Sequence, residues 1–226
     1  MKNKFAALLL FATMFISQPG LADDALKARE VVEKANLSVK NFTVDPNMQY
    51  LRDNIGNAEG LLIIPAMIKG AFIVGGSGGT GVLLSKAQGD KNQWSSPAFY
   101  TMSSGSIGFQ WGGEVSEIIL MVMTKKGMDH LLSSSFKLGA DATVAAGPVG
   151  VGTKAQTADI LAYSRSKGAF AGFSVEGAVV KVRSKYNAAY YRKDVRPVDI
   201  LVAQNISSPH ADGLRSSVSA LIAAGK

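Results

Sequence analysis

The chain has 226 residues, 47% of them hydrophobic, which is enough for one domain with a substantial core and too little for a second domain of ordinary size. It contains no cysteine, which excludes disulfides and a thiol for lipid attachment. The formal net charge of +7 favours anionic partners in general. Nucleic acid is not favoured, because no basic run carries the interleaved aromatic residues that bind single strands.

Residues 1–22 have the three-part pattern of a secretory signal peptide. Lys2 and Lys4 precede an apolar run over residues 5–16, and small residues lead to Ala22. The run is shorter than the about 20 residues that span a bilayer. We therefore expect cleavage after Ala22 and a periplasmic or secreted protein, with peripheral attachment to a membrane left open. Removing Lys2 and Lys4 lowers the formal net charge from +7 to +5.

Residues 24–42 have the spacing of an amphipathic helix. The apolar residues recur with a helical period and are Ala28, Val31, Val32, Ala35, Val39 and Phe42. Covering a sheet is the commoner use of such a helix, and insertion into a membrane surface is the alternative.

From Gly60 onward, glycine punctuates short apolar and β-branched runs. The predicted strands are 61–64, 70–76, 81–85, 96–102, 106–113 and 117–124, with further strand texture over 136–147 and 160–184. Short strands at near-regular spacing favour an antiparallel sheet, and internal glycines indicate bulges and curvature. The predicted fold is α+β: a curved, glycine-rich antiparallel β-sheet or partly closed barrel packed with N-terminal and C-terminal helices.

Three further helices are predicted, one between the strand segments and two after them. Thr124 can cap a helix over 125–134, Pro197 can begin one over 197–204, and Ser208 with Pro209 can begin the last. Residues 23–226 are then one domain.

The glycines Gly76, Gly78 and Gly81 have the spacing G-x-G-x-x-G of a dinucleotide-binding loop. That loop needs a helix directly after it, but only VLLSKA precedes the next turn signal. A Walker loop would have lysine where this chain has Val82. We therefore expect a glycine-rich strand and no nucleotide.

Catalytic motifs are weakly supported. Tyr163 and Lys167 match Y-x-x-x-K, and Ser164 with Lys167 matches S-x-x-K, but the companion motifs and the required helix are missing. His130 and His210 lie in separate segments without metal-site spacing. The sequence predicts no enzyme, no cofactor and no metal.

Several long strings resemble the SYLF domain, a lipid-binding family found in bacterial exported proteins and beside SH3 or FYVE modules in eukaryotes. The most specific are GADATVAAGPVG (139–150) and YSRSKGAFAGFSVEG (163–177), and the resemblance spans roughly residues 30–205. It implies binding of anionic phospholipids or phosphoinositide-like lipids, with an amphipathic N-terminal helix contributing to membrane contact. Basic residues beside the glycine-rich turns would contact the headgroup: Lys69, Arg165 and Lys167.

Two departures from the family pattern matter. Members often carry a basic residue within the glycine stretch and another after AAGPVG, whereas this chain has Ser77 and then 151–153, VGT. Apolar contact is therefore expected to contribute more. No SH3 or FYVE segment is recognised, so the resemblance does not imply an actin-related role. The alternative is a structural or protein-interaction envelope protein without bound lipid, whose protein partner is unknown.

Overall fold

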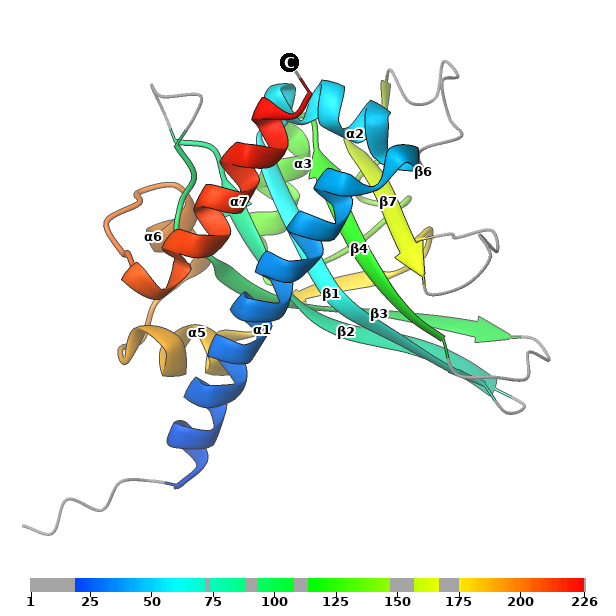
Figure 1. Ribbon diagram of the computed structural model, residues 1–226. Coiled ribbons are helices and arrows are strands. Elements are labelled where there is room, and N and C mark those ends of the chain that lie inside the picture. Colours follow the sequence, from blue (N-terminus) through cyan, green and yellow to red (C-terminus); the bar gives the residue numbers. More distant parts are fainter. Residues whose placement is uncertain are drawn as a thin grey trace, which may run out of the picture.

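The structure is a computed structural model that describes residues 19–71, 74–87, 93–107, 114–146, 157–166 and 175–225. Helices α1, α2 and α7 lie on one side of a large sheet, with α1 crossing the strands and α7 beside it (Figure 1). The helices are α1 (Pro19–Val44), α2 (Gln49–Asn54), α3 (Lys125–Leu132), α5 (Ser184–Tyr191), α6 (Pro197–Leu201) and α7 (Asp212–Ala223). Short 3-10 turns are η1 (Pro46–Met48), η2 (Ile55–Asn57) and η3 (Pro209–Ala211).

The described strands form one sheet in the order β5-β8-β3-β2-β1-β4-β7-β6. Their bounds are β1 (Gly60–Ala71), β2 (Val74–Ser85), β3 (Ala98–Ile107), β4 (Glu114–Val122), β5 (Ser135–Lys137), β6 (Val144–Ala146), β7 (Ile160–Ser166) and β8 (Val179–Val182). Neighbours are antiparallel except β6 and β7, which are parallel. The predicted α+β fold with a curved sheet and terminal helices is confirmed (Figure 1).

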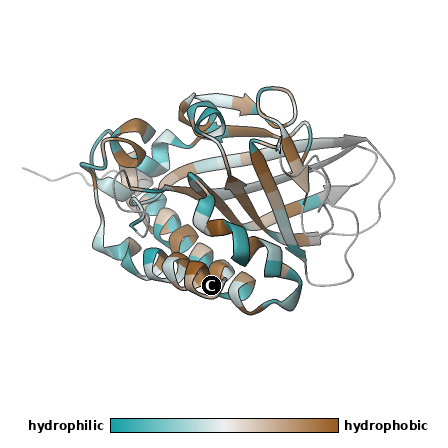
Figure 2. Cartoon of the chain, turned by 90° about the horizontal axis from the view of Figure 1, so that it is seen from above, coloured by the Kyte–Doolittle hydropathy of each residue, from teal (hydrophilic) through white to brown (hydrophobic). Residues whose placement is uncertain are grey.

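The sheet separates two hydrophobic clusters. The first lies under α1, α2 and α7 and includes Phe42, Ile63 and Leu161. The second lies on the opposite face and includes Ile64, Leu120 and α3 residues. Figure 2 shows that the strands between these layers are predominantly hydrophobic, whereas the helices have mixed faces.

Helix α1 covers the sheet, as the commoner use of its pattern predicts. Its apolar stripe is fully or almost fully buried at Ala28, Val32, Ala35, Val39 and Phe42. Burial of this stripe contributes roughly 25 cal/mol per Å² of apolar surface removed from water. Insertion of the same stripe into a membrane would therefore require α1 to leave the sheet.

The glycine-rich segment is a strand, as expected. Gly76, Gly78 and Gly81 all lie inside β2, paired with β1 or β3. A β-carbon on Gly81 would lie 2.3 Å from the Ile63 carbonyl oxygen. That distance is far below van der Waals contact, so glycine at this position permits the close approach of β1.

Strand boundaries differ from the predicted ones where glycine was taken to end a strand. The predicted strands 61–64 and 70–76 are instead β1, which continues through Gly70, and the first part of β2. Pro65 lies where the register of β1 shifts by one residue against both neighbours. The bulge accommodates a residue that cannot donate to the ladder.

The predicted C-terminal helices are confirmed, with Thr124 capping α3 through a 3.0 Å hydrogen bond from the Gly127 N–H. Helix α5 was not predicted, because its eight residues follow strand texture directly and have little amphipathic period. Among the described helices, none is long and apolar enough to cross a membrane.

Candidate functional site

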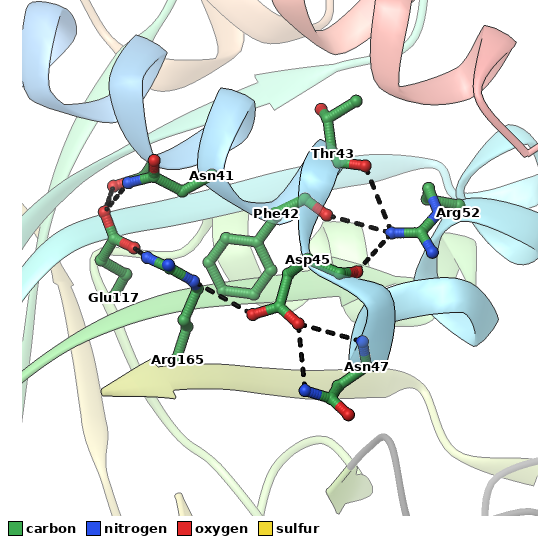
Figure 3. A network of polar contacts seen from close by, with 9 residues as sticks. Asn41, Phe42, Thr43, Asp45, Asn47, Arg52, Glu117 and Arg165 are labelled. Atoms are coloured by element: carbon green, nitrogen blue, oxygen red, sulfur yellow. Dashed lines mark hydrogen bonds and ion pairs between the residues drawn. The ribbon is translucent and has the colours of Figure 1, made fainter. Parts of the chain in front are cut away.

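Arg165 lies at the centre of a polar network that joins α1, η1, β4 and β7 (Figure 3). Its Nε lies 3.1 Å from Asp45 Oδ2, and its Nη1 lies 2.9 Å from Glu117 Oε2. Glu117 faces Arg165 directly in the β4–β7 register. A guanidinium between two carboxylates on separate elements works as a clamp between them.

Both carboxylates have further donors. The side chains of Ser38 and Asn41 each donate to Glu117 Oε1 at 2.9 Å. Asp45 accepts from the Asn47 backbone N–H at 3.0 Å and so caps η1. The hydrogen bond from Arg165 to Glu117 and the bond to Asp45 raise the pKa of Arg165 above its ordinary value, while its partial burial lowers it. The network therefore holds its cation permanently charged.

Arg52 extends the network to the end of α1. Its Nη1 donates to the carbonyl oxygens of Asp45, Thr43 and Phe42 at 2.6, 3.3 and 3.4 Å. The Phe42 and Thr43 carbonyls belong to the last turn of the helix, which has no intrahelical donors left for them, and Asp45 directly follows that turn. Arg52 thus caps α1 and fixes where it ends above the sheet (Figure 3).

The structure does not bring the predicted headgroup residues Lys69 and Arg165 together. Lys69 follows the bulge in β1 and shares its face with Met67, which belongs to the second hydrophobic cluster. Arg165 shares its face with Tyr163, which belongs to the first. Lys69 and Arg165 therefore lie on opposite faces of the sheet. Lys167 lies outside the described residues.

Beyond the clamp, part of the α1 face of the sheet is uncovered. Ile68 of β1 and Val115 of β4 are direct cross-strand partners, and they are 59% and 53% exposed. The same row of cross-strand partners continues from Ile68 over the next four strands. Its members there are Gly78 on β2, Ser103 on β3, Val179 on β8 and Lys137 on β5. We call this cross-strand set the open row, and each member is exposed: Lys137, Val179, Ser103, Gly78, Ile68 and Val115.

Basic residues flank the β5–β8 end of the open row. Lys181 is exposed on β8, two residues from Val179 and therefore on the same face. Arg183 follows, with its guanidinium carbon 3.8 Å from the centroid of the Tyr186 ring and Nη1 donating to Thr80 at 3.1 Å. The face thus combines apolar side chains with cations.

Sequence analysis missed the open row. Ile68 and Val115 lie between the predicted strands, and the bulge together with the end of α1 leaves them exposed. The signal that could have indicated them was Pro65 within an otherwise regular strand, since proline there marks a bulge that switches the faces of the residues after it.

The catalytic motifs are not assembled in the described residues. Tyr163 is on a strand and fully buried in the first cluster, and burial raises the pKa of its phenol. His130 lies in α3 and His210 in η3. Within the described ranges no three His, Cys, Asp or Glu side chains are grouped so as to hold a metal ion.

Fold and site define a small α+β domain whose sheet keeps one part of a face open. Residues 103–221 match the sequence profile of the family Ysc84, described as "Las17-binding protein actin regulator". The chain belongs to this Ysc84/SYLF family, so the resemblance noted from the sequence is confirmed.

Relatives carry additional sequence. The chain is similar to SH3 domain-containing YSC84-like protein 1 of Bos taurus, at 31% identity over 166 residues, covering 71% of this chain and 48% of that protein. It is similar to Protein YSC84 of Saccharomyces cerevisiae, at 28% identity over 196 residues, covering 80% of this chain and 41% of that protein. The chain therefore spans about half or less of the length of these relatives. No solved structure matches it.

Proposed function

We propose that this protein is a non-enzymatic binder of anionic phospholipid surfaces. The observation that carries the proposal is the exposed pair Ile68 and Val115, two large apolar side chains directly opposite each other on an uncovered sheet face. Exposed apolar side chains gathered on one surface are typical of interaction sites. Nearby cations and the positive formal net charge, +7 for the whole chain and +5 without Lys2 and Lys4, favour an anionic partner over a neutral one.

Helix α1 is the other surface that the family resemblance suggests for membrane contact. Its buried stripe is used in the core, so only isolated apolar residues such as Leu26 and Leu37 remain exposed on it. They alternate with the charged residues Glu30 and Glu33, which makes a poor insertion face. The sheet face is therefore the better candidate.

Headgroup contact by Lys69, Arg165 and Lys167 stays a prediction. Arg165 is engaged by two carboxylates, so a phosphate would compete with Asp45 and Glu117 for it. Lys69 can be tested alone, because it lies outside this clamp. If Lys69 contacts the headgroup, Lys69→Gln weakens binding to anionic vesicles while the free energy of unfolding stays unchanged.

The test of the function is flotation of the purified protein with phosphatidylcholine vesicles, compared with vesicles that also contain phosphatidylglycerol or phosphatidylinositol. We expect co-flotation with the anionic vesicles only, weakened by salt because surface charge interactions are screened. Equal recovery with both vesicle types, or with neither, contradicts the proposal.

A protein partner is the second candidate function, and the family description as a Las17-binding actin regulator favours it. The same open face could receive a protein. Crosslinking in cells that recovers one stable partner, together with no vesicle binding by the pure protein, would favour this candidate.

We also propose export with cleavage after Ala22. In support, the first residue of α1 in a hydrophobic cluster is Ala28, so removal of residues 1–22 leaves the described core contacts intact. The intact mass of protein recovered from its native cells tests this proposal. A mature chain beginning at Asp23 supports it, and a chain that retains residue 1 contradicts it.

A further inference from the structure

We propose that the lipid partner is an intact bilayer, which the protein meets through the open row, and not a single lipid held inside the fold. This inference rests on the proposed function and names the surface and the form of its partner. Its basis is the continuity of the row, the space around its glycines and the arrangement of charge.

The open row is continuous across six neighbouring strands, from Lys137 on β5 to Val115 on β4. Five inter-strand steps of about 4.8 Å give it a span of roughly 24 Å. A surface of this width contacts several lipid headgroups at once. A binding site for one lipid would instead gather its polar groups around a single point.

Among the described residues, nothing packs closely on the face of the glycines beside the apolar residues. In the described part of the chain, a β-carbon on Gly105 would meet nothing within 4 Å, and those on Gly76 and Gly78 would meet only carbonyl oxygens at 3.6 and 4.0 Å. Gly79 differs from these glycines. Its β-carbon would point to the opposite face and lie only 2.6 Å from the Ala66 carbonyl oxygen, so packing requires glycine there. Glycine in a strand weakens the strand, so Gly76, Gly78 and Gly105 call for a contact outside the chain.

Their positions join the apolar residues into one smooth surface. Gly76 and Gly105 are direct partners, and they lie on the same face as Gly78 and Ser103, two residues along each strand. Ile68 and Val115 lie at one end of this bare patch, and Val179 lies beyond Ser103. A partner that approaches this patch meets bare backbone at the three glycines and the short side chain of Ser103 between them and Val179.

Charge distinguishes a bilayer from a second copy of the chain as occupant. Lys137 and Lys181 lie at the β5–β8 end of the face. The Asp141 carboxylate accepts from the Lys137 backbone N–H, and Glu117 is held by Arg165, Ser38 and Asn41. A second copy docked on the same face would bring the lysines against uncharged Ile68 and Val115, whereas lipid phosphates would pair with the lysines.

The experiment adds charge to the bare patch without disturbing packing. We compare the wild type, a Gly78→Glu/Gly105→Glu variant and a Leu26→Glu/Leu37→Glu variant, which adds the same charge to exposed positions of α1. Binding to phosphatidylcholine–phosphatidylglycerol vesicles is measured, with urea unfolding confirming that each variant is folded. We expect about tenfold or greater weakening for the glycine variant and less than about twofold for the helix variant.

Three results bear on different claims. Wild-type protein that ignores anionic vesicles overturns the proposed function, and the inference with it. Wild-type binding that survives in the folded glycine variant but is lost in the helix variant overturns only the inference. The inference is also overturned if one molecule of a short-chain phosphatidylglycerol binds each protein below the critical micelle concentration, with an affinity equal to that for vesicles. A bilayer would then not be required.

Discussion

Arg165 on β7 and Glu117 on β4 are cross-strand neighbours on the same face of the sheet. Their side chains form a 2.9 Å ion pair at the point where α1 ends. Val115, two residues before Glu117 and near the N-terminal end of β4, is 53% exposed. The clamp therefore marks the boundary between the covered and the open part of this face. Any role of the open face depends on the clamp holding α1 where it is.

Removing the cation of the clamp should destabilise the fold. Arg165→Gln leaves the carboxylates of Asp45 and Glu117 without their counterion, and their side chains are only 12% and 20% exposed. We expect the free energy of unfolding to fall by about 1–3 kcal/mol in urea titrations. Lys40→Gln, at an exposed position of α1, is the control and should change it by less than about 0.5 kcal/mol. Equal effects of the two substitutions would show that the clamp contributes no stability.

Asp159 should make stability depend on pH in the acid range. Burial alone would raise the pKa of its carboxyl, but hydrogen bonds from Thr124 and Thr143 and the charge of Lys126 lower it below the ordinary value of 3.8. A depressed pKa gives a contribution that is complete above the unfolded-state pKa, about 3.9, and lost as pH falls through the folded-state pKa. The wild type should therefore lose stability faster than Asp159→Asn below about pH 4. Parallel acid profiles for the two proteins, measured by urea unfolding at each pH, would contradict this assignment.

Two buried tyrosines should respond oppositely to loss of their hydroxyl. Tyr100 donates to the Leu131 carbonyl at 2.6 Å, whereas the Tyr163 hydroxyl is buried with no hydrogen-bond partner among the described residues. We expect Tyr100→Phe to lower the free energy of unfolding by about 1 kcal/mol and Tyr163→Phe to leave it unchanged or raise it. Thermal and urea unfolding measure both. A large loss for Tyr163→Phe would mean that its hydroxyl has a partner.

Two glycines of the sheet should tolerate alanine very differently. A β-carbon on Gly81 would collide with the Ile63 carbonyl oxygen, but one on Gly105 would enter open space. Gly81→Ala should cost about 2 kcal/mol or more, while Gly105→Ala should be neutral or stabilising by up to about 1 kcal/mol. Similar losses at both positions would contradict the close approach of β1 and β2.

Much of the fold could be predicted from local patterns. The helical period of residues 24–42, the cap at Thr124 and the proline that begins α6 each indicated an element that the structure confirms. The absence of room for a helix after Gly81 correctly assigned that segment to a strand. These signals depend on neighbours in the sequence, so no tertiary information was needed.

The site was less predictable, because it depends on faces and registers. A one-residue bulge near Pro65 moves Lys69 to the face opposite Arg165, and the proline indicates a bulge without giving the resulting register. The ion-pair partners of Arg165 are Asp45 and Glu117, which are 120 and 48 positions away along the chain. Reading Arg165 as a free cation was reasonable from its neighbours, but its engagement by two acids follows only from the folded arrangement.

The central claim is that the open row, and not α1, contacts an anionic bilayer. Because the chain has no cysteine, a single environment-sensitive fluorophore can be attached at Ile68→Cys or, in a separate protein, at Leu37→Cys. On addition of phosphatidylglycerol-containing vesicles, we predict a blue shift and increased intensity for the label at position 68, with no change at position 37. A response at position 37 alone would contradict the account and assign membrane contact to α1.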